Sequence, residues 1–364
     1  MRLCITGCAG FLGYWITTQC LDAGIEVDGV DDLSSTYDAS LKEWRLAQLV
    51  GRTGFRFVRL DVVDQSALEG FFGDAGSAVP NSSGGPFDAI VHLAAISNVR
   101  RSIQDAVSTY RTNVLGTLSL LEMCIRWRVG RFVLASSASV YGGTSLLGDV
   151  GARDGRSAPR PSCETDPTDG MLSPYAASKR AAEDLCRLYH RMYDLDIAVL
   201  RYFTPYGPAG RPDTSVFRFV RQLAEGEPVT VYGNGRQLRD YAYAADIARG
   251  TLAALDVEGY EVINLGGGVP VTINQVLDRL YQHIGTPLRR TEVPPLVGDV
   301  EASWADIAKA KALLGWSPST SLDEGLRETV EWYRSHRDWL RDLPLDAGES
   351  TNRSAEAAKD RRAG

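Results

Sequence analysis

Met1-Arg-Leu-Cys-Ile-Thr-Gly-Cys-Ala-Gly-Phe-Leu-Gly13 opens the sequence, and in it a short apolar run leads directly into three glycines. Glycines spaced GxxGxxG between an apolar run and an amphipathic stretch are typical of a strand, a turn and a helix that bind a diphosphate. Gly7 permits the tight turn, Gly10 lets the backbone approach the anion, and Gly13 lets helix and strand pack closely. The first N–H groups of the helix then face the anion.

The same alternation continues through the first two thirds of the chain. Short apolar runs are followed by amphipathic stretches, as in a parallel sheet with crossover helices. The strand candidates are 3–6, 27–30, 55–60, 89–93, 132–135 and 198–201, and the helix candidates are 10–23, 40–50, 65–72, 109–126 and 174–193. We therefore predict an α/β fold with a Rossmann-type, doubly wound parallel sheet.

After Tyr206 the pattern loosens into a turn-rich segment and shorter elements. The later candidates are helices 215–225, 244–255, 273–284, 307–314 and 322–340, and strands 229–232 and 262–265. We predict a dinucleotide-binding domain over 1–206, with an interleaved boundary, and a smaller C-terminal α/β substrate domain over 207–345. The tail 346–364 has no large apolar residue and is predicted to be disordered. The segment 142–169 is predicted to be a long loop that gates the site or contacts a partner subunit.

The composition is that of an ordinary globular protein. Of 364 residues, 44% are hydrophobic and 23% are charged, and the formal net charge is −7, which argues against nucleic acid or an anionic membrane as the main partner. No stretch approaches the roughly 20 apolar residues of a membrane span, and the first residues do not resemble a signal peptide. The six cysteines form no CxxC pair and show no metal-ligand spacing. We expect a cytoplasmic protein with reduced thiols and no metal site.

Two aspartates end predicted strands near the glycine turn. Asp31 lies about 20 residues beyond the glycines, where a carboxylate accepts a hydrogen bond from a ribose 2′-hydroxyl. That carboxylate would repel a 2′-phosphate, and no arginine follows immediately. The sequence therefore favours NAD over NADP. Asp61 ends the third strand and is expected near the adenine.

A tyrosine, a lysine and a serine form the candidate catalytic group. Tyr175 and Lys179 are four residues apart on a predicted helix and so share a face. A free tyrosine has a pKa near 10, and neighbouring positive charge favours its phenolate form. We predict that Tyr175 is the proton acceptor. Ser137 follows the fifth strand and is predicted to relay the proton between substrate and Tyr175.

These motifs resemble the extended short-chain dehydrogenase/reductase family, whose members bind NAD tightly and act on nucleotide sugars. The resemblance runs from Met1 to about Arg334 and includes His92-Leu93-Ala94-Ala95 and Arg201-Tyr202-Phe203. It implies a homodimer in which the helices 109–126 and 174–193 pair in a four-helix bundle. The cofactor-binding residues that we expect are Gly7, Gly10, Phe11, Leu12, Gly13, Asp31, Asp61, Val62, Leu93, Ala94, Ala95, Asn113, Tyr175, Lys179 and Tyr202.

Within this family, the stretches 37–43, 99–102, 203–208 and 210–213 resemble the UDP-glucuronate 4-epimerases. This implies epimerisation of UDP-glucuronate to UDP-galacturonate through a transient 4-keto sugar. The intermediate is a β-keto acid, so its carboxylate must be held where CO₂ loss is unproductive. The substrate-binding residues that we expect are Thr204 and Arg211, with Ser139 and Arg100 as weaker candidates for the carboxylate, Arg239 for the diphosphate, Asp299 for the uridine ribose, and Ser137.

Other activities remain open at this point. Dehydratases and decarboxylases of the family carry an acid just after the relay hydroxyl, where this chain has Ala138 and Ser139. Without that general acid, elimination is disfavoured. The alternatives are a UDP-glucose/UDP-galactose 4-epimerase, a UDP-glucuronate decarboxylase, and a non-enzymatic nucleotide-sensing scaffold. An intact Tyr175, Lys179 and Ser137 argue against the last.

Overall fold

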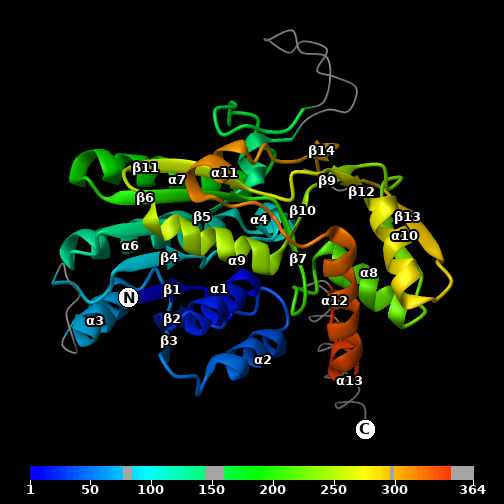
Figure 1. Cartoon of the computed structure of the whole chain (residues 1–364), viewed down its shortest axis with the longest axis horizontal. Coiled ribbons are helices and arrows are strands. Elements are labelled where there is room, and N and C mark those ends of the chain that lie inside the picture. Colours follow the sequence, from blue (N-terminus) through cyan, green and yellow to red (C-terminus); the bar gives the residue numbers. More distant parts are fainter. Residues whose placement is uncertain (77–83, 144–159, 296–298, 346–364) are drawn as a thin grey trace.

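A seven-stranded parallel sheet forms the centre of the molecule (Figure 1). The computed structural model describes residues 1–76, 84–143, 160–295 and 299–345. The strand order is β11-β6-β5-β4-β1-β2-β3. The strands are β1 (Arg2–Thr6), β2 (Glu26–Asp31), β3 (Phe55–Arg59), β4 (Ala89–His92), β5 (Arg131–Ser137), β6 (Asp196–Tyr202) and β11 (Tyr260–Leu265). The predicted Rossmann-type sheet is confirmed.

Helices cover both faces of this sheet. One face carries α1 (Phe11–Asp22), α9 (Ala244–Ala253) and α11 (Ala308–Leu314), and the other carries α3 (Gln65–Gly76), α6 (Gly116–Arg126) and α7 (Pro174–Tyr193). Successive side chains of β1 enter different cores, because Leu3 and Ile5 pack toward α1 whereas Cys4 packs toward α3 and α6. This alternation is why the strands are apolar on both faces.

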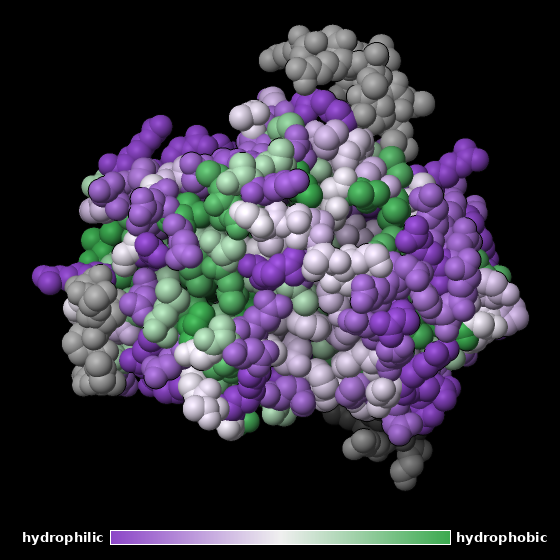
Figure 2. Space-filling view, in the orientation of Figure 1, coloured by the Kyte–Doolittle hydropathy of each residue, from purple (hydrophilic) through white to green (hydrophobic). Residues whose placement is uncertain are grey.

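The later elements build a smaller unit beside the sheet. Its helices are α8 (Ser215–Ala224), α10 (Ile273–Ile284), α12 (Leu322–Ser335) and α13 (Arg337–Leu340). Its short strands are β7 (Thr204–Tyr206), β8 (Val229–Tyr232), β9 (Leu238–Arg239), β10 (Tyr241–Tyr243), β12 (Val271–Thr272), β13 (Arg290–Val293) and β14 (Ala302–Ser303). Figure 2 shows a mostly hydrophilic surface over α8 and α10, while their inner sides share an apolar core with α12.

The chain crosses between the two units more than once. β11 lies beyond residue 206 but pairs with β6 along its whole length and completes the main sheet. The segment 207–345 is therefore not one continuous unit, because β11 within it belongs to the main sheet. Between β2 and β3, α2 (Ala39–Leu49) packs against both parts, since Trp44 contacts Tyr14 of α1 and Trp332 of α12.

Two predicted helices are interrupted. The helix predicted over 109–126 is α5 (Ala106–Tyr110), a π-helical turn η1 (Arg111–Leu115) and α6, and the wider turn directs Asn113 toward the backbone of Ile96. The helix predicted over 322–340 breaks at His336. The ring of His336 bonds to the Trp332 carbonyl, which is the acceptor that a continuing helix would use for the His336 N–H.

Some predictions fall outside the described residues. The predicted disordered tail 346–364 lies there entirely, and so do residues 144–159 of the predicted gating loop. The described end of that loop is anchored to the C-terminal unit, where Ser162 forms a β-bridge with Ala305. Within the described ranges, none of the helices combines the length and apolar character needed to cross a bilayer.

The turn between β1 and α1 brings backbone atoms closer together than a side chain would allow. A Cβ at Gly13 would lie 2.0 Å from the Gly7 carbonyl oxygen. At Gly7, φ is +73° and a Cβ would lie 2.8 Å from the Ala94 nitrogen. Only glycine permits this joint approach of β1, α1 and the loop after β4.

We predict that Gly13→Ala destabilises the protein by on the order of 3 kcal/mol, because the added methyl group overlaps the Gly7 carbonyl. The matched control is Gly70→Ala, since Gly70 lies within α3 and a Cβ there meets nothing within 4 Å. The control should stabilise by about 0.5–1 kcal/mol through helix propensity. Chemical and thermal denaturation measure both, and equal unfolding midpoints for Gly13→Ala and wild type would contradict the steric argument.

Candidate active site

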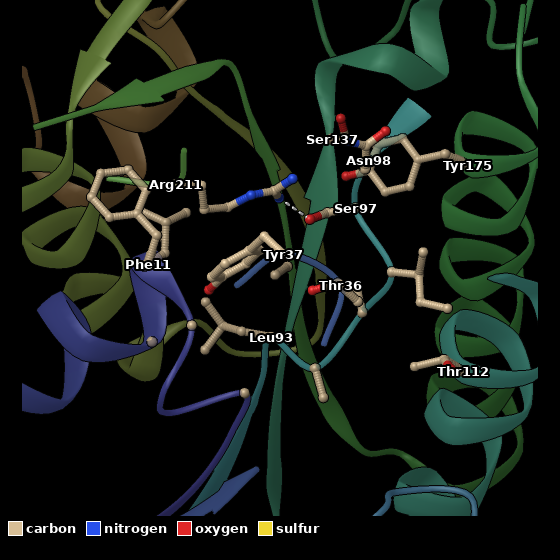
Figure 3. A pocket seen from close by; sticks show the side chains of 18 of the residues that line it. Phe11, Thr36, Tyr37, Leu93, Ser97, Asn98, Thr112, Ser137, Tyr175 and Arg211 are labelled. Carbon is tan, nitrogen blue, oxygen red and sulfur yellow. Dashed lines mark hydrogen bonds between the residues drawn. The ribbon is translucent and has the colours of Figure 1, made fainter. Parts of the chain in front are cut away.

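A cavity of about 600 Å³ opens where the sheet order reverses between β1 and β4, at the carboxyl ends of the strands (Figure 3). Open α/β sheets bind ligands at this place. Most of the predicted site residues line it: Gly7, Gly10, Phe11, Leu12, Gly13, Asp31, Asp61, Val62, Leu93, Ala94, Ala95, Arg100, Ser137, Tyr175, Lys179, Tyr202, Thr204, Arg211 and Asp299. The structure thus brings together residues from eight separate stretches of the sequence.

Three predicted residues do not line the cavity but contact residues that do. Asn113 uses its amide on the backbone of Ile96 and on Ser178, at 2.8–3.0 Å, so it fixes the cavity wall from behind. Ser139 donates to the Ser137 hydroxyl at 2.9 Å. Arg239 forms an ion pair with Asp299, which reaches the cavity from the loop before β14.

One end of the cavity fits a dinucleotide. Gly7, Gly10 and Gly13 of the glycine turn line this end, and the N-terminus of α1 follows directly. Asp31 ends β2 within this end, where one carboxylate oxygen accepts the Ala9 N–H and the other accepts the Leu33 N–H at 2.8 Å. Lys42 pairs with Asp31 at 3.0 Å, a contact that the sequence did not single out.

Tyr175 begins α7 at the other end of the cavity. Ser173 caps the helix and Pro174 occupies its first turn, so the phenol projects beside the end of β5. Burial raises the pKa of Tyr175, while a hydrogen bond with Ser137 and the positive charge of Arg211 lower it. Among the described residues, Arg211 is thus a cation that favours the phenolate form, besides the Lys179 that the sequence indicates.

Lys179 lies one turn further along α7 and is also buried. Its ammonium donates to the Ala135 carbonyl at 2.7 Å, which ties α7 to the end of β5. Burial lowers the pKa of Lys179 to about 8, against the opposing influence of Cys186 and Glu183. Near neutral pH the side chain therefore remains a cation with two donors directed away from Ala135.

Arg211 extends into the middle of the cavity, between Tyr37 on one side and Ser137 and Tyr175 on the other (Figure 3). Its Nε donates to one oxygen of Asp213 at 2.9 Å, its Nη2 donates to the other, and its Nη1 donates to Ser97. Burial opposes the charge of Arg211, but Asp213 outweighs it and the pKa of Arg211 lies above its usual value. Nη1 and Nη2 each keep one further N–H, so Arg211 can still donate to an anion in the cavity.

Four of the lining residues that matter here were not predicted as site residues. Tyr37, Ser97, Asn98 and Asp213 surround the guanidinium of Arg211 or its partner, and Asn98 donates to Asp213 at 2.6 Å. Tyr37 and Asp213 do lie in stretches that carried the resemblance. Ser97 and Asn98 follow β4, so their place after a strand end was the available signal.

A buried charge pair supports the wall behind Ser137. Glu183, four residues beyond Lys179 on α7, accepts two bonds from Arg201 of β6 at 2.7 and 3.0 Å. The same carboxylate accepts the Ser136 hydroxyl at 2.5 Å. His92 is neutral, because burial and Lys179 lower its pKa to about 3, and its ring bonds to Thr6 and Thr117. It is therefore a packed histidine at the end of β4.

Comparisons with known proteins agree with this site. The model of the NAD dependent epimerase/dehydratase family matches residues 3–266. The UDP-glucuronate 4-epimerase of Thermodesulfobacterium geofontis is 41% identical over 342 residues, covering 94% of this chain and 98% of the relative.

Two solved structures share the fold over almost their whole length. The UDP-glucuronic acid 4-epimerase of Bacillus cereus, in complex with UDP-glucuronic acid and NAD, has a TM-score of 0.81 at 32% identity, covering 92% of this chain and 100% of that one. The UDP-glucose 4-epimerase of Thermotoga maritima, with UDP-glucose, has a TM-score of 0.81 at 31% identity, covering 93% and 100%. This chain therefore belongs to the NAD-dependent epimerase/dehydratase family, as an enzyme of nucleotide sugars that uses NAD as its cofactor.

Proposed function

We propose that this enzyme interconverts UDP-glucuronate and UDP-galacturonate by epimerisation at C4, without loss of CO₂. One observation carries the proposal: a fixed cation, Arg211, and a candidate proton acceptor, Tyr175, face the same cavity closely enough to influence each other's pKa. A sugar that presents both a hydroxyl group to deprotonate and an acidic group to bind fits this pair. UDP-glucuronate has O4 and the C6 carboxylate on adjacent ring positions.

Tyr175 accepts the O4 proton in this proposal, and Ser137 hydrogen-bonds to the phenol and to the substrate oxygen. Bound NAD supplies the acceptor and later the donor of the C4 hydrogen, so there is no net redox change. Lys179 lines the cavity one turn along α7 from Tyr175 and holds α7 against β5. The residues that the glycine turn and Asp31 contribute serve the dinucleotide.

Arg211 and Thr204 bind the carboxylate in the proposal. Thr204 lines the cavity at the start of β7, where its N–H is already bonded to the Asp240 carbonyl at 3.0 Å, so its hydroxyl is the group that it offers. Two fixed donors hold the carboxylate, and with it C6, so that the C5–C6 bond stays close to the plane of the C4 ketone and out of overlap with its π system. Arg100, Arg239 and Asp299 remain proposed contacts of the UDP portion and the sugar, and Ser139 acts through Ser137.

Incubation with UDP-glucuronate, followed by NMR of the products, tests the proposal. We expect UDP-galacturonate to accumulate to a constant ratio, with no added reductant. Formation of CO₂ and a UDP-pentose would instead identify a UDP-glucuronate decarboxylase. Turnover of UDP-glucose without turnover of UDP-glucuronate would identify a UDP-glucose/UDP-galactose 4-epimerase. Tyr175→Phe should lower turnover at least about 10³-fold while NAD remains bound.

The hydrogen bond from Ser137 gives a pH prediction. This bond lowers the pKa of Tyr175, so Ser137→Ala raises that pKa, and a higher pH is then needed for the same fraction of phenolate. The acidic limb of the kcat/KM profile should move upward by about one pH unit, the worth of a hydrogen bond to a charged group. Ser119→Ala is the control, because that hydroxyl is buried on α6 and has no hydrogen-bond partner among the described residues. An unshifted limb in Ser137→Ala would exclude this role for Ser137.

We also propose that the enzyme is a homodimer. Apolar side chains project to solvent from α4 (Val99–Gln104), α5, η1 and α7, elements that pack on one another. They are Ile103, Val107, Tyr110, Leu115, Leu188, Met192 and Tyr193. Val107 is 81% exposed and Met192 is 57% exposed, which is unusual for a surface that remains in water.

Light scattering after gel filtration tests the dimer. The wild type should elute with twice the mass of one chain, and the double variant Val107→Glu/Met192→Glu should elute as a monomer, because two buried charges per subunit would face the partner. Val269→Glu is the control, since Val269 is 68% exposed but lies between β11 and β12, away from this surface. A monomeric wild type, or a double variant that stays dimeric, would refute the proposal.

A further inference from the structure

Arg45 of α2 is the largest fully buried side chain that the proposed chemistry does not use. Its exposed fraction is 0%, and in the described part of the chain it forms no ion pair. Removing a guanidinium from water is expensive unless its N–H groups find acceptors. Here the acceptors are Ala9, Tyr37, Ala209 and Gly210. Arg45 therefore fixes the relative positions of these four residues.

Arg45 connects the cofactor turn to the turn that carries Arg211. On one side, Nη1 donates to the Ala9 carbonyl, inside the glycine turn, at 3.2 Å. On the other side, Nε and Nη2 donate to the Ala209 carbonyl at 2.9 and 2.7 Å, and Nη2 also reaches the Gly210 carbonyl at 3.2 Å. Ala209 and Gly210 immediately precede Arg211.

The backbone held in this way is strained. Ala209 has φ +58°, in the left-handed region, which is unfavourable for a residue with a Cβ. Three hydrogen bonds from one buried guanidinium to two successive carbonyls offset that cost. They select the turn shape from which Arg211 extends into the cavity rather than toward solvent.

Tyr37 connects the two arginines directly. Its ring lies under both guanidinium groups, 5.5 Å from that of Arg45 and 5.6 Å from that of Arg211, and its hydroxyl accepts from Arg45 at 2.6 Å. Tyr37 is itself buried and lines the cavity, and Figure 3 shows its ring next to the guanidinium of Arg211. The ring attracts a cation near its face, and this attraction is stronger where water is excluded.

We infer that Arg45 and Tyr37 are positioning residues that fix the guanidinium of Arg211 against the acidic group of the substrate. The inference rests on the proposed function, because that function gives Arg211 an anion to bind. Neither residue touches a reacting atom. The same helix carries Lys42, which pairs with Asp31, so α2 joins the ribose-binding end of the cavity to the carboxylate-binding end.

A loosened Arg211 has a specific chemical consequence. When the carboxylate of the 4-keto sugar is held less firmly, the sugar ring can change its pucker so that the C5–C6 bond aligns with the π system of the ketone. The bond then breaks, CO₂ leaves, the electron pair of the bond forms an enolate with the C4 ketone, and a proton adds at C5 to give a UDP-4-keto-pentose. The hydride that the cofactor would hold then returns to C4, so no further oxidant or reductant is needed. The fraction of turnovers that ends in CO₂ and a pentose therefore reports how well Arg211 is positioned, independently of how fast the enzyme turns over.

The test compares the product ratio of four variants with that of the wild type. Tyr37→Leu and Arg45→Lys should each raise the ratio of decarboxylated product to UDP-galacturonate at least tenfold, measured by NMR, and raise the KM for UDP-glucuronate while NAD content is unchanged. Tyr37→Phe keeps the aromatic face and should restore most of the wild-type ratio. Arg221→Lys is the control, because Arg221 is another buried arginine, on α8, that bonds to the Leu343 carbonyl and does not line the cavity. A fall in kcat with an unchanged product ratio in Tyr37→Leu and Arg45→Lys would overturn the inference.

A second measurement separates this inference from the proposed function. In a crystal structure of Tyr37→Leu, we expect the guanidinium of Arg211 to lie away from Ser97 and from residue 37, whatever the substrate of the enzyme. An Arg211 in its wild-type position in that structure would overturn the inference even if UDP-glucuronate is epimerised. Conversely, a displaced Arg211 in an enzyme that does not convert UDP-glucuronate would support the positioning role and refute the proposed function.

Discussion

The ion pair between Arg211 and Asp213 sets the chemical character of the cavity. Asp213 accepts hydrogen bonds from Nε and Nη2 of Arg211. The guanidinium keeps one further N–H on each Nη, and it lines the same cavity as Tyr175. Asn98 holds Asp213 from the loop after β4, and Ser97 holds Arg211 from the same loop. A cation fixed from several sides costs little reorganisation when an anion arrives, which is the condition for selective binding of an acidic sugar.

The sheet makes this arrangement possible by ending several strands at one edge. The glycine turn after β1, Asp31 after β2, Ser97 after β4, Ser137 at the end of β5 and Thr204 after β6 all reach one cavity. The buried pair Glu183–Arg201 and the contact of Lys179 with Ala135 fasten α7 to β5 and β6. These contacts hold α7, and with it Tyr175, firmly against the sheet. Arg211, which faces the phenol, instead comes from a turn that Arg45 holds.

The sequence predicted the fold and half of the lining residues because those features have local patterns. A strand followed by GxxGxxG, a YxxxK pair on a helix and hydroxyls at a strand end can each be recognised within a dozen residues. The residues that it missed act through contacts across the fold. Arg45 looks like an exposed basic residue of an amphipathic helix, and only the structure shows it bonded to Ala209, 164 positions away. The π-helical turn at Asn113 was missed for a similar reason. The Asn113 side chain bonds to the backbone of Ile96, which lies in the loop after β4, far from Asn113 in the local pattern.

Arg211 adds a second cation to the surroundings of Tyr175. The spacing of Tyr175 and Lys179 predicts that the ammonium favours the phenolate, and in the structure that ammonium donates to the Ala135 carbonyl while Ser137 and Arg211 lower the pKa of Tyr175. In the proposed function, Arg211 therefore both binds the acid group of the substrate and favours the base. Loss of Arg211 would then affect both binding and proton transfer.

A crystal structure of the enzyme with NAD and UDP-glucuronate tests the central claim most directly. The account predicts the sugar O4 within about 3 Å of the Tyr175 hydroxyl and, in the same complex, a carboxylate oxygen within about 3 Å of Arg211. A sugar whose carboxylate points to solvent or to another cation, with Arg211 bonded only to Asp213 and Ser97, would contradict it.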